Sequence, residues 1–366
     1  MKRRTKTKVV AGGGLGILLV AALYVIGLSN LYVIEYDRAS ADPVASSTAD
    51  GTTVAAHPTL NIQAYNAKMK ALAHVATTSL ATSTASTTPV KTPLWPPKTV
   101  YPNAGALLPF NRIVAYYGNF YSTAMGVLGE YPPAVVEQKL EAAAGEWQQA
   151  DPSTPVIPAV DYIAVTAQAS PGTDGKYRAR MPDSQIDKAV SLAADVHGIV
   201  ILDVQVGLSS VQTEVPLLEK YLKMPQVNLA LDPEFAMQTS GRAPGTVIGT
   251  LDASDINFAA NYLAGLVREY HLPPKILVVH RFTEDMVTNY KAITPLPEVE
   301  IVMDMDGWGF PAKKINTYNA VIAPEPVQFT GFKLFYKADL QPPSTRLLTP
   351  QEVLRLTPAP SFIQYQ

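Results

Sequence analysis

The chain has 366 residues, a net charge of −2, 47% hydrophobic residues and no cysteine. The near-neutral charge, without a basic stripe in the C-terminal part, argues against nucleic acid as a partner. The lack of cysteine excludes disulfides, thiolate chemistry, zinc ribbons and lipid attachment at a lipobox cysteine. Folding must therefore rely on a large hydrophobic core.

The first segment predicts a membrane anchor. Residues 1–8 carry five positive charges, and no charged residue occurs from Val9 to Ile34. Residues 9–30 are long enough to cross the ~30 Å hydrocarbon layer of a lipid bilayer as a helix. The basic residues 1–8 should stay in the cytoplasm. We expect a single-pass signal-anchor in the cell membrane with an extracytoplasmic C-terminal domain; cleavage as a signal peptide is the alternative.

Residues 31–100 are rich in Ala, Ser, Thr and Pro, with runs such as TTSLATSTASTTP. This composition cannot bury enough apolar surface to offset chain entropy. It predicts a disordered stalk, within which residues 65–75 have enough apolar periodicity for one short helix.

Residues 101–366 alternate short apolar runs with amphipathic segments, the pattern of parallel βα units. We expect a (β/α)8 TIM-like barrel with strands at 112–119, 156–166, 198–206, 227–235, 275–282, 300–307, 320–325 and 331–336. Helical stripes lie between them, and Asp252 stands where an N-cap belongs. Only residues 326–330 join the last two strands, so one helix is missing there. An open doubly wound sheet is the alternative.

Polar residues gather at the carboxyl ends of these strands, where barrel active sites are built. Side chains two residues apart on a strand lie on the same face, and three pairs of polar residues have this spacing. The pairs are Asp203 with Gln205, Asp232 with Glu234, and Asp304 with Asp306, and other strand-end residues are His280, Arg281, Glu325 and Lys333. Trp308 and Tyr116 could stack on sugar rings.

Each of these residues also has a structural explanation. Asp203, Asp304 and Asp306 could form turns, and Asp232 could set the turn before Pro233. His280 could hydrogen-bond inside the core, and the aromatic residues could be packing. Glu234 has the least structural need among them.

The residue inventory narrows the chemistry. There is no GxSxG elbow, no phosphate-binding glycine loop in the C-terminal part, and only His280 among the histidines lies at a strand end. We therefore expect carboxylate chemistry without a metal or cofactor. Glu234 and Glu325 occupy positions similar to the acid/base and the nucleophile of retaining barrel glycosidases, although Pro233 replaces the Asn that usually precedes the acid/base. Asp203 and Asp306 are alternative partners.

The strings LDVQVG, LALDPEF, DGWGFPAKKINTY, GFKLFYKAD and LTPQEVLRLTPAPSFIQYQ occur in this order. As a set, they resemble an uncharacterised family of secreted or lipid-anchored bacterial surface proteins, notably of actinobacteria, with a glycosidase-like barrel. The resemblance spans about residues 112–366 and implies fold and location, without an activity. Arg281 follows His280 here, where the family has a His-Gln-Phe-Arg string.

Two functions fit these observations. The first is a membrane-anchored hydrolase of cell-wall or surface polysaccharide that uses paired carboxylates. The second is a non-catalytic barrel that binds a glycan or a surface partner through the same residues.

Overall fold

The computed structural model describes residues 59–75 and 93–366. The predicted cytoplasmic tail, the predicted membrane helix at residues 9–30 and much of the predicted stalk lie outside these residues. In the part that is described, no helix combines the length and hydrophobicity that a membrane span requires.

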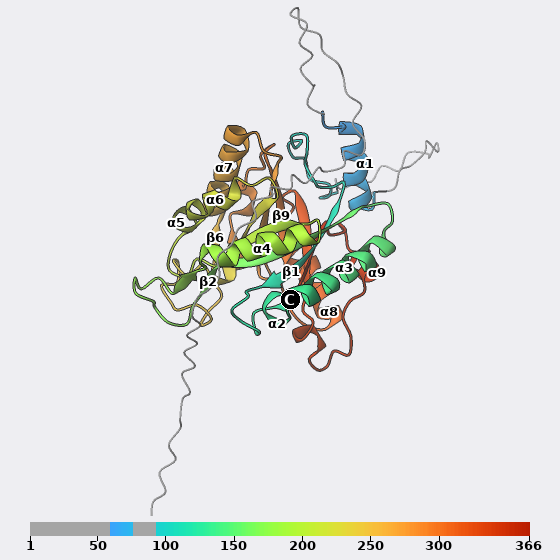
Figure 1. The fold of residues 1–366 in the computed structure, drawn as a ribbon. Coiled ribbons are helices and arrows are strands. Elements are labelled where there is room, and N and C mark those ends of the chain that lie inside the picture. The colour runs from blue at the N-terminus through green and yellow to red at the C-terminus, as the bar shows by residue number, and fades with distance from the viewer. Residues whose placement is uncertain (1–58, 76–92) are drawn as a thin grey trace, which may run out of the picture. The chain divides into compact units, whose positions relative to one another are not determined.

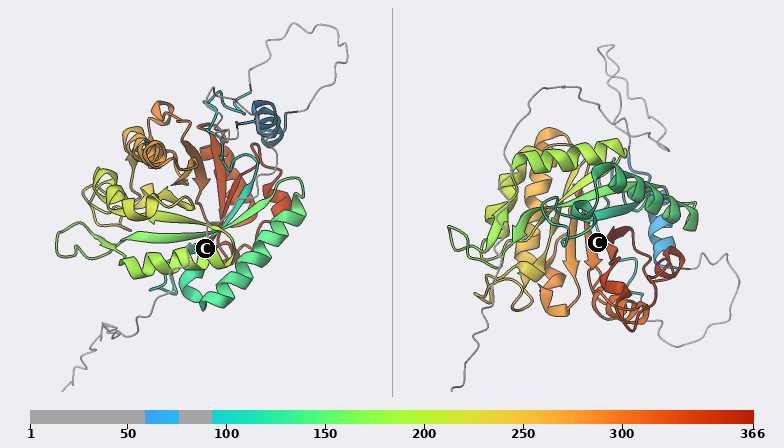
Figure 2. Two further views of the ribbon diagram at one scale, coloured as in Figure 1. Left: turned by 45° about the horizontal axis from the view of Figure 1, so that its top comes forward. Right: turned by 60° about the horizontal axis from the view of Figure 1, so that its bottom comes forward.

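Eight parallel strands close into a barrel (Figures 1 and 2). Their order is β1-β11-β10-β9-β7-β5-β4-β2, and pairing of β1 with β2 joins the two ends. The strands are β1 (Arg112–Gly118), β2 (Val156–Ala167), β4 (Ile199–Val204), β5 (Val227–Leu231), β7 (Lys275–Arg281), β9 (Val299–Met305), β10 (Phe329–Leu334) and β11 (Phe362–Tyr365). The predicted TIM-like barrel is confirmed, and the open sheet is excluded by the β1–β2 ladder.

Helices connect most of the strands on the outside of the barrel (Figure 2). They are α2 (Val127–Glu130), α3 (Pro133–Ala150), α4 (Asp183–Asp195), α5 (Val211–Glu214), α6 (Glu219–Leu222), α7 (Ala253–Tyr270), α8 (Pro311–Thr317) and α9 (Pro350–Val353). Asp252 caps α7 through a capping box with Asp255, as its position predicted. The short strand β3 (Arg178–Arg180) runs antiparallel to β2, and β6 (Leu251–Asp252) pairs with β8 (Val287–Thr288).

The prediction for the last two of the eight strands is wrong in order. Residues 320–325 do not form a strand: α8 continues into a π-helical turn, Tyr318–Ile322, whose Val321 and Ile322 face the core. A short apolar run fits a buried helix face as well as a strand, so periodicity could not separate them. The predicted eighth strand is the seventh, β10, and the eighth is the unpredicted β11. The connection without an α-helix lies between β7 and β9, which holds two short 3-10 turns and the short strand β8.

The strands are packed between two hydrophobic layers, one outside the barrel and one inside it. The outer layer fills the space between the strands and the helices, with Trp147 of α3 and Ile256 of α7 fully buried in it. The inner layer fills the barrel near the amino ends of the strands. It consists of Leu108, Ile113, Ala115, Ala159, Ile199, Ile201, Ala230, Ile276, Val278, Val302, Phe329 and Phe362, with Tyr65 and Met69 from α1.

Helix α1 (Ile62–Leu72) covers the amino-terminal end of the barrel. Its Tyr65 and Met69 are almost fully buried, and Asn61 caps its first turn by accepting from the backbone N–H of Ala64. Trp95, from the same predicted stalk, is buried and donates to the Ala323 carbonyl at 2.7 Å. The short helix predicted at residues 65–75 is confirmed. The folded domain, however, includes described residues before the predicted boundary at 101.

Candidate active site

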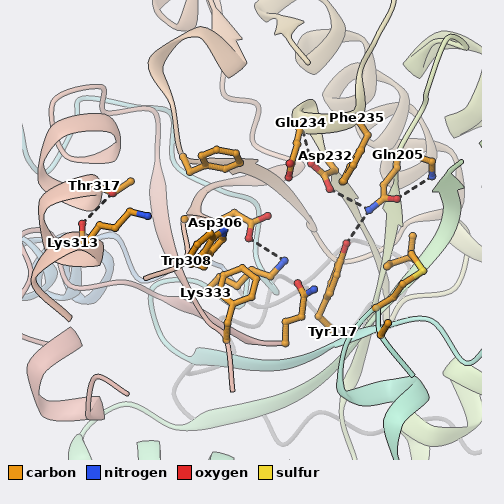
Figure 3. A pocket seen from close by; sticks show the side chains of 18 residues that line it. Tyr117, Gln205, Asp232, Glu234, Phe235, Asp306, Trp308, Lys313, Thr317 and Lys333 are labelled. Atoms are coloured by element: carbon orange, nitrogen blue, oxygen red, sulfur yellow. Dashed lines mark hydrogen bonds and ion pairs between the residues drawn. The ribbon is translucent and has the colours of Figure 1, made fainter. Parts of the chain in front are cut away.

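A cavity of about 440 Å³ opens at the carboxyl ends of the barrel strands (Figure 3). Its polar lining includes residues that stand just after a strand: Gln205 follows β4, Asp232 and Glu234 follow β5, and Asp306 follows β9. In a parallel barrel these ends meet on one face, so the wall combines side chains from distant parts of the chain. The full lining is Tyr117, Ala124, Met125, Ile163, Ala167, Gln205, Asp232, Glu234, Phe235, Phe282, Asp306, Gly307, Trp308, Lys313, Thr317, Lys333, Phe335 and Gln366.

Glu234 is the half-buried carboxyl group of the cavity wall. It lies in the 3-10 turn Pro233–Phe235, which Asp232 caps by accepting from the Glu234 backbone N–H at 3.1 Å. Burial, reinforced by the negative charge of Asp306, raises the pKa of Glu234 to about 7. The group therefore holds a proton over much of the neutral range and can act as an acid.

A hydrogen-bonded chain fixes the wall next to Glu234. The Gln205 side-chain amide donates to Asp232 at 3.2 Å and to the Tyr117 hydroxyl at 3.1 Å. Its oxygen accepts from the Ala167 backbone N–H at 3.0 Å. Burial raises the pKa of Asp232 well above its usual value, and the Asp203 charge adds to this. These bonds use all the polar atoms of Gln205 and hold Asp232 in one orientation.

Asp306 forms an ion pair with Lys333 beside Glu234. The Lys333 ammonium lies 3.1 Å from an Asp306 oxygen and 3.9 Å from the centre of the Tyr117 ring. Burial lowers the pKa of Lys333, but Asp306, Asp232 and Asp304 together raise it, so the side chain is a cation. Asp306 is 8% exposed and lines the cavity, which makes it the carboxylate that stands beside the proton-bearing Glu234.

His280 lies beneath this pair, fully buried inside the barrel. Its Nδ1 lies 3.1 Å from Asp304, and its Nε2 lies 3.5 Å from Asp203. Burial lowers the pKa of His280, but the contacts with Asp203 and Asp304 outweigh burial and raise it well above its usual value. An imidazolium at this position compensates for carboxylates that the barrel interior could not otherwise hold.

Asp161, from the middle of β2, belongs to the same buried cluster. The Gln364 side chain of β11 donates to one of its oxygens at 2.6 Å. Burial and the nearby Asp203 raise the pKa of Asp161 to about 8. Around pH 7 a proton on Asp161 leaves the cluster with fewer negative charges than carboxyl groups, which favours its burial.

Trp308 is exposed on a loop whose backbone is held on both sides by hydrogen bonds. Its side chain is 52% exposed, yet both neighbouring residues are held by a buried ion pair between Lys314 and Asp339. The Lys314 ammonium donates to the Gly307 carbonyl at 2.8 Å, and the Gly309 backbone N–H donates to Asp339 at 2.8 Å. A large aromatic surface is therefore held in place at the rim of the cavity.

The predicted site residues fall into three groups. Those that line the cavity are Glu234, Asp306, Asp232, Gln205, Trp308 and Lys333. Asp203, His280 and Asp304 lie below it in the barrel interior.

The third group faces away from the cavity. Tyr116 points into the outer core and donates to the Lys139 carbonyl at 2.9 Å. Arg281, next to the inward-pointing His280, forms an ion pair with Glu325. The Glu325 carboxylate therefore contacts Arg281 and not Glu234.

Sequence reasoning did not assign several residues of this region. Lys313 is on α8 rather than at a strand end, and Phe235, Phe282 and Phe335 look like packing residues in the sequence. Asp161 interrupts an otherwise apolar strand, VIPAVDYIAVTA, which is a signal that could have been used. Gln364 was hidden because β11 itself was not predicted.

No group of three or more His, Cys, Asp or Glu side chains suited to a metal ion occurs within residues 59–75 and 93–366. The carboxylates of the cluster are instead held by His280, Lys333 and side-chain amides.

Comparisons with known proteins find similar folds among solved structures. No family model and no curated protein matches the sequence. Among solved structures, the chain is similar to a GH5 xyloglucan-specific endo-beta-1,4-glucanase from a metagenomic library, in complex with cellotriose, with a TM-score of 0.34, 12% identity and coverage of 68% of this chain and 81% of that one.

Two other solved structures are similar to the same extent. One is a ruminal GH26 endo-beta-1,4-mannanase, with a TM-score of 0.34, 12% identity and coverage of 69% of this chain and 58% of that one. The other is Plasmodium falciparum HPPK-DHPS with pteroate, with a TM-score of 0.33, 11% identity and coverage of 70% of this chain and 44% of that one. The molecule itself is a closed parallel β/α barrel with an acidic cavity at its carboxyl-terminal mouth.

Proposed function

We propose that this protein hydrolyses a glycan at the mouth of the barrel, with Glu234 as the general acid. The observation that carries the proposal is a carboxyl group with a pKa of about 7 that lines a cavity beside a second carboxylate, Asp306. Glycoside hydrolysis needs such a pair, one member protonated and one ionised. The chemistry requires no metal or cofactor.

Asp306 is the best-placed partner for Glu234. Asp203 and Asp304 are buried below the cavity, and Glu325 is bound to Arg281. In the reaction Glu234 gives its proton to the glycosidic oxygen as the bond to the anomeric carbon breaks. In the same step Asp306 either accepts a proton from water that attacks this carbon or attacks the carbon itself, and the resulting glycosyl ester is then hydrolysed by water that gives a proton to Glu234. The anomeric configuration of the first product, followed by NMR, distinguishes inversion from retention.

Replacing Glu234 by Gln tests the role of the acid. With full-length protein in detergent, we expect reducing-end release from bacterial cell-wall and surface polysaccharides to fall by about 10²–10⁴-fold, the usual contribution of general acid catalysis. Glycan binding should persist, because the amide has the same shape. Glu269→Gln, an exposed carboxyl on α7, is the matched control and should be fully active.

The pH profile provides an independent reading of the same group. Because the acid must be protonated, kcat/KM should fall about tenfold per pH unit above a pKa of about 7. A rate that keeps rising to pH 9, or full activity of the Glu234→Gln protein, would exclude Glu234 as the acid.

One observation favours a second function, a glycan-binding barrel without turnover. The charge of Asp306 is already matched by Lys333 at 3.1 Å, with His280 at 3.8 Å, so its carboxylate has less capacity as a base or nucleophile. If saturable glycan binding occurs with no release of reducing ends from any polysaccharide, this second function replaces the first.

For its location, we propose anchoring in the cell membrane through residues 9–30, with the barrel outside. The support is the charge-free apolar stretch that follows five basic residues. Fractionation of the native host protein, followed by protease treatment of intact cells stripped of wall, tests it. A barrel that is protected from protease, or that is recovered in the soluble fraction, contradicts the anchor.

A further inference from the structure

The rim of the cavity on the β9 side carries an aromatic side chain and a cation next to each other. The Lys313 ammonium lies 4.5 Å from the centre of the Trp308 ring, and both side chains line the cavity (Figure 3). Lys313 has no ion-pair partner among residues 59–75 and 93–366. The neighbouring Lys314 differs, because it is buried and paired with Asp339 at 2.9 Å.

The backbone leaves room for Lys313 in this position. Gly309 has φ +144, and a Cβ built on it would lie 2.6 Å from Cδ of Lys313, so the lysine stem packs where a side chain would stand. Lys313 also lies in the first turn of α8, where the helix dipole disfavours a positive charge. Local helix chemistry therefore gives no reason for a lysine here, while the cavity does.

The charges that line the cavity do not oppose an anion at this rim. Two lysines, Lys313 and Lys333, face three carboxyl side chains. Burial raises the pKa of Glu234 to about 7 and the pKa of Asp232 well above its usual value, which disfavours a negative charge on both. Asp306 is already paired with Lys333. Lys313 is therefore the uncompensated charge of the wall.

We propose that Trp308 and Lys313 form a subsite for a sugar that carries a carboxylate, so that the glycan is acidic. The pyranose ring would contact the exposed indole, and the ammonium would bind the carboxylate by a charge-assisted hydrogen bond. The inference rests on the proposed function in that it assigns a substrate class to the same cavity. A neutral glycan would leave the Lys313 ammonium without an ionic partner in the described residues.

Binding measurements separate the carboxylate from the rest of the sugar. The probes are oligosaccharides of galacturonic, glucuronic and mannuronic acid, each paired with its carboxyl-reduced, neutral form. They are titrated by calorimetry into full-length Glu234→Gln protein, which prevents turnover. At least one acidic form should bind more tightly than its neutral counterpart, and the difference should shrink as salt is raised.

Lys313→Gln in the same background should remove this preference. We expect the acidic form to bind roughly tenfold more weakly, as for the loss of one charge-assisted hydrogen bond, and the neutral form to bind within about twofold of before. The matched control is Lys291→Gln, because Lys291 also lies over an aromatic ring, that of Tyr290 at 5.8 Å, but does not line the cavity. It should leave both affinities unchanged.

Three outcomes would overturn the proposal: no acidic probe binds, acidic and neutral forms bind equally, or Lys313→Gln weakens both forms alike. A different result is expected if the subsite is real but the protein is not a hydrolase. The carboxylate preference and its loss in Lys313→Gln are then observed, but wild-type protein releases no reducing ends from the acidic oligosaccharides.

Discussion

The two halves of the barrel interior are built from the same strands but have opposite character. Between the amino ends and the middle of the strands the interior is mostly apolar, with Ile201, Val278 and Val302 fully buried; Glu300, two residues before Val302, is the buried polar exception on β9. Two residues further along the same strands stand Asp203, His280 and Asp304, which are equally buried but ionisable. Apolar burial stabilises a fold, whereas buried charge costs stability unless it is compensated. The amino-terminal half therefore holds the barrel together, and the carboxyl-terminal half carries the site.

The ends of the barrel differ in the same way. The amino-terminal end is covered by α1 and by residues 107 and 108, whose backbone N–H groups donate to Glu300. The carboxyl-terminal end opens into the 440 Å³ cavity. If this division is correct, changes at the two ends should affect different properties.

The largest effect on stability is expected from Met69→Ala in α1. Met69 is 5% exposed and packs into the inner layer, so its truncation should lower the free energy of unfolding by ~2–5 kcal/mol. Denaturant unfolding of the full-length protein measures this. The exposed neighbour Lys70→Ala should change stability by less than about 0.5 kcal/mol. Glycan binding by Met69→Ala below its unfolding transition should be normal; a loss of affinity would contradict the division.

A smaller effect is expected from Gly331→Ala on β10. Gly331 pairs in register with Asp304, and a Cβ at residue 331 would overlap an Asp304 carboxylate oxygen. Asp304 would have to move away from His280, at a cost of ~1–3 kcal/mol in stability. Gly145→Ala in α3 is the opposite control: its Cβ would meet nothing within 4 Å, so it should stabilise by ~0.5–1 kcal/mol. Equal effects of the two substitutions on thermal unfolding would show that the carboxylate cluster tolerates displacement.

A third effect, which depends on pH, is expected from Glu300→Gln. Burial raises the pKa of Glu300 to about 8, although the N–H groups of Leu107 and Leu108 lower it. Between the unfolded value and pH 8 the folded state holds an extra proton, so stability falls as pH rises, by up to ~1.4 kcal/mol per unit.

Glu300→Gln removes this contribution. The stability of wild type relative to the variant should therefore decline from pH 5 to pH 8 in denaturant unfolding. A difference that does not change with pH over this range would mean that Glu300 is ionised in the folded protein.

Much of the barrel could be predicted because its signals are local. The first six strands and the α3 and α7 stripes follow from apolar runs and period, and Asp252 follows from capping chemistry. The seventh predicted strand was wrong because Val321 and Ile322 are apolar enough for either kind of element. β11 was missed because it is only four residues long, Phe362–Tyr365, and is interrupted by the polar Gln364.

The sequence predicted where on the barrel the site lies, but not which side chains face the cavity and which are buried elsewhere. Carboxylates at strand ends pointed to the mouth of the barrel, where Glu234 and Asp306 lie. Tyr116 and Tyr117 show what was missing: they are adjacent aromatic residues, one in the outer core and one in the cavity wall. Only the register of β1 against its neighbours decides which of them faces inward.

The sequence by itself determined the alternation of strands and helices and the polar carboxyl ends of the strands, because these depend on residues close together in the chain. The tertiary structure alone decided the closure of β1 on β2, the docking of α1, the separation of Glu325 from Glu234 and the meeting of Lys313 with Trp308. These features depend on strand pairing and burial between distant segments, and no local pattern encodes which segments meet.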